Sequence, residues 1–141
     1  MLGRRANRHR EDPQASASRQ AVVAELAQRA LEGMALDELR KVAAAGIARE
    51  LGVEQVALLE LTRDGRGLLA RAGVGLPGGV LGGVLPAGPG DPPGPSALGH
   101  DLRASSSCHV PIETRARRSG WIEVHSRAAR DFTAEEDGFL R

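Results

Sequence analysis

Apolar residues recur at three- and four-residue steps through the first third of the chain, which predicts two amphipathic helices. The first helix starts with Ser18 as its N-cap and stops at Gly33, and the second runs from about Leu36 to Leu51 with Gly52 as its C-terminal cap. Each apolar stripe suits packing against a sheet, and the first equally suits pairing with its copy in a second chain. The apolar positions are Val22, Val23, Leu26, Ala30 and Leu31 in the first helix and Leu36, Leu39, Val42, Ala43, Ile47 and Leu51 in the second.

Later segments form short apolar runs that flank turns, which predicts β-strands. Asp64-Gly65, between the first two of these segments, is a strong hairpin-turn signal. The order of elements is helix, helix, hairpin, irregular segment, hairpin, helix. Antiparallel hairpins with helices at the two ends predict an α+β fold. The strands are expected at about residues 55–61, 68–74, 106–113 and 119–126.

The last quarter of the chain runs from a strand directly into a capped helix. Ile122 and Val124 alternate with Trp121 and Glu123, so each pair shares one face of the predicted strand. After a short loop, a Thr-x-x-Glu capping box starts the next helix, because its hydroxyl and carboxylate satisfy amides that the first turn leaves without partners. The capping residues are Thr133 and Glu136.

The segment between the two hairpins has an unusual composition. From Gly73 to Gly94 it contains 9 Gly and 5 Pro among 22 residues. Such a segment cannot hold a long helix and is poor strand material. We therefore expect residues 73–104 to be irregular.

Five separated pieces of the sequence form a recognisable series. They are the Leu-x-x-Leu helix from Leu36 that ends in Leu51-Gly-Val53, the strand 55–61 followed by Asp64-Gly65, the strand and glycine turn 69–75, the strand Ser107-Cys-His-Val-Pro-Ile112, and Val124-His-Ser126 leading to Phe132-Thr133. Together these pieces resemble the GAF domain, a small regulatory sensor module. The resemblance covers roughly Gln20 to Arg141, and the order and spacing of the pieces are together fairly specific.

The resemblance implies a central antiparallel sheet flanked by N-terminal and C-terminal helices, with a ligand pocket on one side of the sheet. In the family, the segment between the second and penultimate strands roofs that pocket, and here this segment is shortened and rich in Gly and Pro. The domain organisation expected is a disordered basic tail at residues 1–17 and a single GAF-like domain at residues 18–141, irregular at 73–104.

The resemblance also implies a non-catalytic regulatory or sensory domain of a bacterial signal-transduction protein. Such a domain binds a small effector or a partner and relays the event through its terminal helices, which also form a homodimer. One alternative is a chromoprotein or small redox enzyme that depends on Cys108. Another is a degenerate GAF domain that serves only dimerisation.

The net charge and the composition exclude several classes of binding partner. A formal net charge of +1 gives no overall attraction to nucleic acid or acidic membranes, and 2% aromatic residues supply few rings for stacking on bases. No apolar run approaches the roughly 20 residues that span a bilayer, and the basic N-terminus lacks the apolar stretch of a secretory signal. We therefore expect a cytoplasmic protein with no nucleic-acid partner and no membrane partner.

Cys108, His109 and Trp121 are the pocket-side candidates for ligand binding. Leu102-Arg-Ala with Cys108-His109 resembles the stretch around the chromophore cysteine of phytochromes, which are themselves GAF proteins. However, Val110-Pro-Ile112 follows at once and assigns the pair to a strand. Adjacent strand residues point to opposite faces, so His109 is poorly placed to activate the Cys108 thiol. A single cysteine also cannot form an internal disulfide, and a small buried hydrophobe is its expected role.

Metal binding would have to draw on His9, His100, His109, His125, Cys108 and scattered carboxylates. No close pair has the His-x-x-x-His spacing of a helical zinc site, so neither a metal nor another cofactor is predicted. His125 matches the Val-His-Ser of the GAF family, where it is expected to be a satisfied histidine at a strand end. The dispersed Asn-Lys-Phe-Asp-Glu signature of cyclic-nucleotide-binding members cannot be placed.

Overall fold

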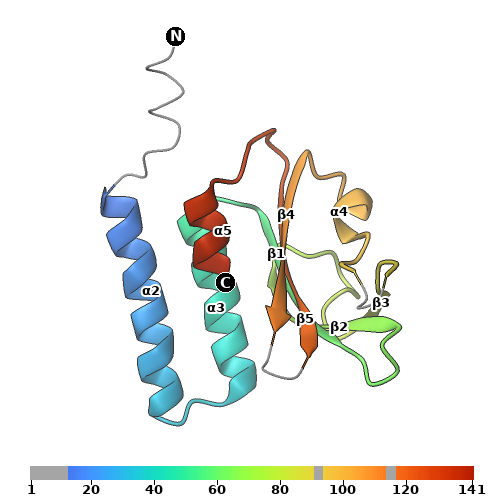
Figure 1. Ribbon diagram of the computed structural model, residues 1–141, viewed down its shortest axis with the longest axis horizontal. Coiled ribbons are helices and arrows are strands. Elements are labelled where there is room, and N and C mark those ends of the chain that lie inside the picture. Colours follow the sequence, from blue (N-terminus) through green and yellow to red (C-terminus); the bar gives the residue numbers. More distant parts are fainter. Residues whose placement is uncertain (1–12, 91–93, 114–116) are drawn as a thin grey trace.

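The computed structural model describes residues 13–90, 94–113 and 117–141, and this part of the chain forms a five-stranded antiparallel sheet with helices on both sides (Figure 1). The strand order is β3-β2-β1-β5-β4, which confirms the α+β fold that the sequence predicts. In chain order the elements are α2 (Pro13–Leu31), α3 (Leu36–Leu51), β1 (Gln55–Leu61), β2 (Gly67–Val74), β3 (Val84–Pro86), α4 (Leu98–Asp101), β4 (Ser106–Glu113), β5 (Arg118–Ser126) and α5 (Ala134–Leu140).

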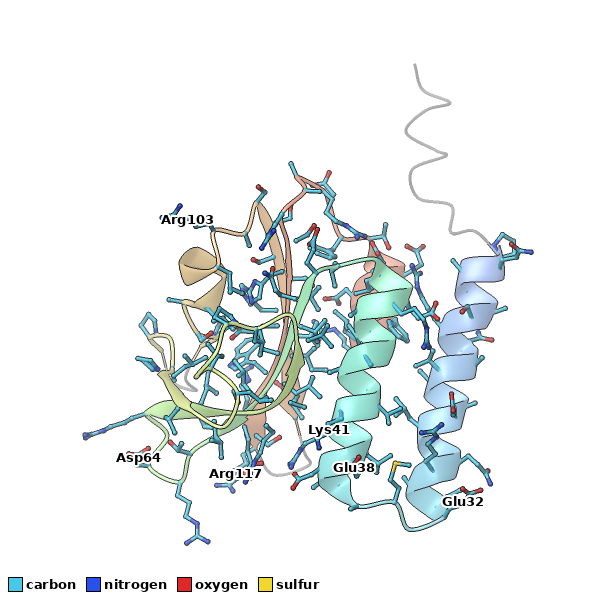
Figure 2. All side chains as sticks on the ribbon, turned by 180° about the vertical axis from the view of Figure 1, so that it is seen from behind. Glu32, Glu38, Lys41, Asp64, Arg103 and Arg117 are labelled. Atoms are coloured by element: carbon cyan, nitrogen blue, oxygen red, sulfur yellow. The ribbon has the colours of Figure 1, made fainter. Side chains whose placement is uncertain are left out.

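A helical layer covers one face of the sheet. Helix α3 packs against β1 and β2, α5 packs against β4, and α2 lies outside α3, as the two opposite views show (Figure 1, Figure 2). The approach of α2 to α3 is close at Gly46, where an added methyl group would come within 3.0 Å of Val22 Cγ1. Within the described residues, none of the helices has the length and apolar character needed to cross a bilayer.

The helix ends follow local signals, with one correction. Helix α3 has the predicted bounds and ends at Gly52, which adopts the left-handed conformation with φ 63°. Within the described residues helix α2 already includes Pro13, ahead of the predicted cap Ser18. Residues 13–17, placed in a disordered tail by the sequence, are therefore helical, whereas residues 1–12 lie outside the described part of the chain. The Ser18 hydroxyl instead donates to Glu50 Oε1 of α3 at 2.8 Å.

The alternation along β5 separates two apolar cores. Ile122 and Val124 face the helical layer, whereas Trp121 packs on the opposite side of the sheet. The helix-side core contains Ala44, Ile47, Leu51, Val53, Val56, Leu58, Ala72, Val110, Val124 and Leu140. The opposite core contains Ala57, Leu59, Leu68, Ala70, Leu98 and Trp121.

The described residues between β2 and β4 cover that second core, and we call them the roof. The roof is mostly turns and loops, as its composition predicts, but it includes the short strand β3, which pairs with β2, and the single-turn helix α4. Leu98 of α4 anchors the roof, with 3% of its surface exposed. The space where the family resemblance places a ligand pocket is therefore packed with side chains of this chain.

Helix α5 begins with the predicted capping box. The Glu136 amide donates to Thr133 Oγ1 at 3.0 Å, and the Thr133 amide donates to Glu136 Oε1 at 3.0 Å. The two hydrogen bonds satisfy amides that the first turn leaves free, which stabilises the helix start.

Candidate functional site

Polar side chains from β4 and β5 meet beneath the roof. In the antiparallel register His109 lies opposite Glu123, and Ser107 lies opposite His125. Because alternate residues of a strand share a face, these four side chains lie on the roof side of the sheet. We call His109, Glu123 and His125, together with Ser107 and Ser96 of the roof, the covered cluster.

Glu123 is fully buried, and the roof holds its carboxylate in place. The backbone N–H of Ser96 donates to Oε2 at 2.8 Å, and the Ser96 hydroxyl donates to Oε1 at 2.8 Å. A buried carboxylate is tolerated only when such partners compensate for its lost hydration. Ser96 therefore fixes both oxygens of Glu123.

His125 is also fully buried and uses its two ring nitrogens differently. Nδ1 shares a hydrogen bond of 2.7 Å with Ser107 Oγ. Nε2 lies 3.3 Å from Glu123 Oε1, yet it has no hydrogen-bond partner among the described residues. Helix α4 passes directly above at Gly99, where an added methyl group would come within 2.8 Å of both Nδ1 and Ser107 Oγ.

His109 completes the cluster at its solvent side. Its ring meets that of His125 edge to face, with the centroids 5.8 Å apart. Although the residue as a whole is exposed, its ring is partly withdrawn from water beside the buried pair. This burial lowers the pKa of His109, while the charge of Glu123 acts in the opposite direction. The imidazole is therefore neutral at neutral pH.

The order Ser107, His125, Glu123 has the group types of a hydrolytic triad, but not its working geometry. A nucleophilic hydroxyl must have room beside it for a substrate carbonyl. Here Gly99 narrows that space on the roof side, where an added methyl group would come within 2.8 Å of Ser107 Oγ and of His125 Nδ1, although Ser107 as a whole is exposed. The arrangement does not favour nucleophilic catalysis.

The three site candidates from the sequence do not gather in one place. His109 and Trp121 face the roof, but Trp121 packs in the apolar core there, and the Arg118 guanidinium lies 4.9 Å from its ring centroid. Cys108 lies on the other face, against the helix-side core. Burial raises the pKa of the Cys108 thiol, and the charges of Asp137 and Glu136 raise it further, so the thiol is not activated.

Sequence reasoning missed Glu123 as a functional candidate, because it sought ligands at helical spacing. The useful signal was the alternation Glu123-Val-His125 on one strand, paired with Cys108-His109 on its neighbour. Residues two apart on a strand share a face, so this pattern places the two β5 side chains together. Which residue of β4 faces these two side chains depends on the register between β4 and β5.

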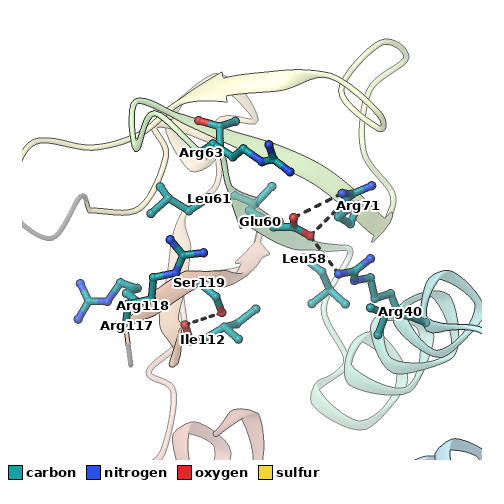
Figure 3. Close-up of a pocket in the computed structure, with 13 residues that line it drawn as sticks. Arg40, Leu58, Glu60, Leu61, Arg63, Arg71, Ile112, Arg117, Arg118 and Ser119 are labelled. Atoms are coloured by element: carbon teal, nitrogen blue, oxygen red, sulfur yellow. Dashed lines mark hydrogen bonds and ion pairs between the residues drawn. The ribbon is translucent and has the colours of Figure 1, made fainter. Parts of the chain in front are cut away.

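A second candidate site is a cavity of about 440 Å³ at the hairpin end of the sheet, shown in Figure 3. Leu36, Leu58 and Ile112 contribute apolar surface to it. Its polar lining is dominated by guanidinium groups. The arginines among the described residues that line the cavity are Arg40, Arg63, Arg71, Arg117 and Arg118. We call it the arginine pocket.

Glu60 of β1 is shared between two of these arginines. Its carboxylate accepts from Arg40 Nη2 of α3 at 3.0 Å and from Arg71 Nε of β2 at 3.1 Å (Figure 3). Arg118 pairs with Glu113 at 3.1 Å, and within the described residues Arg63 makes no ion pair. Five guanidinium groups and one carboxylate line the pocket, and Asp37 pairs with Arg40 from outside the lining. This guanidinium-rich surface is suited to an anion.

Comparisons with known proteins identify the fold. No protein-family model matches the sequence, and no curated protein matches it. Among solved structures, the GAF domain of an Acinetobacter phosphoenolpyruvate-protein phosphotransferase aligns with 92% of this chain and 87% of its own, with a TM-score of 0.69 and 16% identity. The phycoerythrobilin-bound GAF domain of a cyanobacterial phytochrome covers 86% of this chain and 88% of its own, with a TM-score of 0.72 and 15% identity.

A methyl-accepting chemotaxis protein is also similar, with a TM-score of 0.62 and 21% identity over 82% of this chain and 87% of that one. The chain therefore has the GAF-domain fold. At these identities the likeness extends to the fold, and function has to be argued from the sites.

Proposed function

We propose that this chain is a non-catalytic regulatory domain that binds a small acidic effector in the arginine pocket and relays the event to its helical layer. The observation that carries the proposal is Arg40, which belongs to α3 but pairs with Glu60 of the sheet inside the pocket. A cavity of this size is typical of small-molecule sites. The similar structures come from signalling proteins, which agrees with a sensory role.

A carboxylate or phosphate in the pocket competes with Glu60 for Arg40 and Arg71. Both arginines pair with that single carboxylate, so an anion that binds one of them weakens its ion pair with Glu60. Arg40 also pairs with Asp37 at 3.0 Å on the same helix. Redistribution of these pairs changes how α3 is held against β1.

The helical layer is joined by a charged network that carries such a shift onward. Arg130, in the loop before α5, donates through Nη1 to the Leu51 carbonyl at the end of α3 at 2.6 Å, and through Nη2 to Glu136 of α5. Arg19 of α2 approaches the same Glu136 carboxylate at 3.8 Å. A movement of α3 is therefore coupled to both terminal helices.

The output surface in this proposal is the outer side of α2 and α5, where a second copy of the chain binds. A groove of about 470 Å³ lies between the two helices. The apolar Val23, Ala27 and Phe139 line it together with the charged Arg19, Glu135 and Arg141. Val23 is 51% exposed, although it is apolar. A symmetric homodimer, the commonest oligomer of soluble proteins, buries this surface against itself.

The effector class is tested by thermal denaturation of the full chain with inorganic phosphate or citrate at constant ionic strength. We expect a rise in melting temperature that grows with anion concentration. Arg63→Ala should require about tenfold more anion for the same rise, since a charge-assisted hydrogen bond contributes about 1.5–3 kcal/mol. Arg63 suits this purpose because its loss breaks no ion pair within the described residues.

Arg103→Ala is the matched control, because it removes the same charge at the opposite end of the sheet from the pocket residue Arg117, as Figure 2 shows. The control should respond to anions as the unmodified chain does. If neither anion shifts the melting temperature, or if Arg63→Ala and Arg103→Ala respond alike, the arginine pocket is not the effector site.

A further inference from the structure

The covered cluster contains a set of metal-binding groups that the proposed function does not use. His109, Glu123 and His125 each offer one ligand atom, and within the described residues these three atoms lie within 4.8 Å of one another. Two histidines and one glutamate form a donor set that zinc proteins use when the fourth position is left open. The strand register brings the three groups together, with no contribution from the roof.

The buried nitrogen of His125 points to a cation at this position. When Nδ1 carries the ring proton, it donates to Ser107 Oγ at 2.7 Å, and Nε2 is left with a free lone pair. That lone pair is fully buried, has no hydrogen-bond partner among the described residues and faces the Glu123 carboxylate. In this tautomer a cation between the two electron-rich atoms satisfies both, whereas in the other tautomer a proton on Nε2 faces Glu123 Oε1 at 3.3 Å.

The spacing of the atoms fits a tetrahedral metal ion. With zinc–ligand bonds of about 2.0–2.1 Å, neighbouring ligand atoms of a tetrahedron lie about 3.3 Å apart. His125 Nε2 and Glu123 Oε1 are separated by 3.3 Å. The His109 ring lies farther out and has to approach by no more than about 1.5 Å. Its exposed position leaves it free to turn inward.

The groups around the ligands are those that a metal site needs. Metal-binding histidines usually donate their second N–H to a fixed acceptor, which here is Ser107 Oγ. A ligating carboxylate is usually held by further hydrogen bonds, and Ser96 supplies two of them to Glu123. Because Ser96 and Ser107 fix the orientation of Glu123 and His125, two of the three ligand groups are preorganised.

We propose that His109, Glu123 and His125 bind one divalent transition-metal ion of the zinc type, with a fourth coordination position open toward the solvent on the His109 side. The ion joins β4 to β5 and, through Ser96, strengthens the attachment of the roof. The proposal is independent of the arginine pocket, because the two sites share no residue. Either can fail while the other holds.

The test uses the full chain, titrated with Zn²⁺ by calorimetry and with Co²⁺ by visible absorption. We expect one Zn²⁺ per chain and the intense d–d bands of tetrahedral Co²⁺. His109→Gln should weaken Zn²⁺ binding at least about tenfold. This variant replaces an exposed side chain, so folding is preserved, and Trp121 fluorescence together with circular dichroism verifies that. Glu123→Gln, which keeps the shape of the side chain, should weaken binding at least as strongly.

The matched control is the double variant His9→Gln, His100→Gln, which keeps both cluster histidines and removes the other two in the chain. It should bind Zn²⁺ with unchanged stoichiometry and affinity. Three results would overturn the proposal. These are no binding by the unmodified chain, equal binding by the unmodified chain and His109→Gln, and loss of binding in the control.

Discussion

Leu98→Ala tests how the roof is attached to the sheet. Leu98 belongs to the single-turn helix α4, which is too short to be stable by itself. Its side chain, 3% exposed, packs in the core that also contains Leu59 and Trp121. If this contact holds the roof, truncation of one side chain should destabilise the fold measurably.

The magnitude follows from the buried surface. Replacement of leucine by alanine removes three carbon atoms, and the burial of each is worth about 0.8 kcal/mol, which amounts to about 2.4 kcal/mol. The cavity that remains adds to this loss, and buried Leu→Ala changes cost about 2–5 kcal/mol. The roof consists mostly of turns and loops and can settle into part of the space. We therefore expect a loss of about 3 kcal/mol in the free energy of unfolding.

Urea denaturation followed by tryptophan fluorescence measures the effect, because Trp121 is the one indole of the chain and lies beneath the roof. The emission of native Leu98→Ala should shift to longer wavelength as water reaches the ring. Leu81→Ala is the matched control, since Leu81 is in the same segment but is 55% exposed. It should cost less than about 0.5 kcal/mol.

The reasoning is refuted if Leu98→Ala costs no more than the Leu81 control and leaves the emission unchanged. That outcome would mean that α4 does not pack on the sheet in solution, and that the covered cluster is open to water.

Two further predictions concern the helical layer. Val23→Glu should convert the proposed dimer into a monomer in sedimentation velocity, because it places a further charge in the groove between α2 and α5. Val84→Glu on β3 makes the same change at a 61% exposed valine and should leave the dimer intact. Equal behaviour of the two variants would exclude this surface as the interface. Cys108 should be alkylated at least about tenfold more slowly in the folded chain than in urea at pH 8. Burial raises the pKa of the Cys108 thiol, so the folded chain contains less thiolate than the unfolded chain at the same pH. Equal alkylation rates in the two states would show that the thiol is accessible in the folded chain.

The local elements of this fold could be predicted because their signals are local. The bounds of α3 follow from hydrophobic period and from Gly52, β4 has the predicted range 106–113, and the capping box of α5 follows from Thr133 and Glu136. The predicted start of α2 after Ser18 is wrong, since the described part of the helix already includes Pro13. In the roof, tertiary contacts create the short elements β3 and α4 within a segment whose composition predicts irregular structure.

The candidate sites could be predicted only in part. His109 and Trp121 face the roof, and the separation of Cys108 from His109 follows from strand geometry alone. Glu123 is a site candidate because the register of β4 and β5 places it opposite His109, which is fourteen positions away in the sequence. The arginine pocket joins α3, β1, β2 and β5, and nothing local in the sequence marks Arg40 and Arg118 as neighbours of one cavity.

The sequence by itself determined the alternation on β5, which sends Ile122 and Val124 to the helices and Trp121, Glu123 and His125 to the roof. That division is a property of extended backbone and needs no knowledge of the partner strands. Only the tertiary structure decided what meets those side chains. The strand register, the Ser96 clamp on Glu123 and the approach of Gly99 to His125 arise from the burial of residues far apart in the chain. The donor set of the covered cluster is a product of that packing.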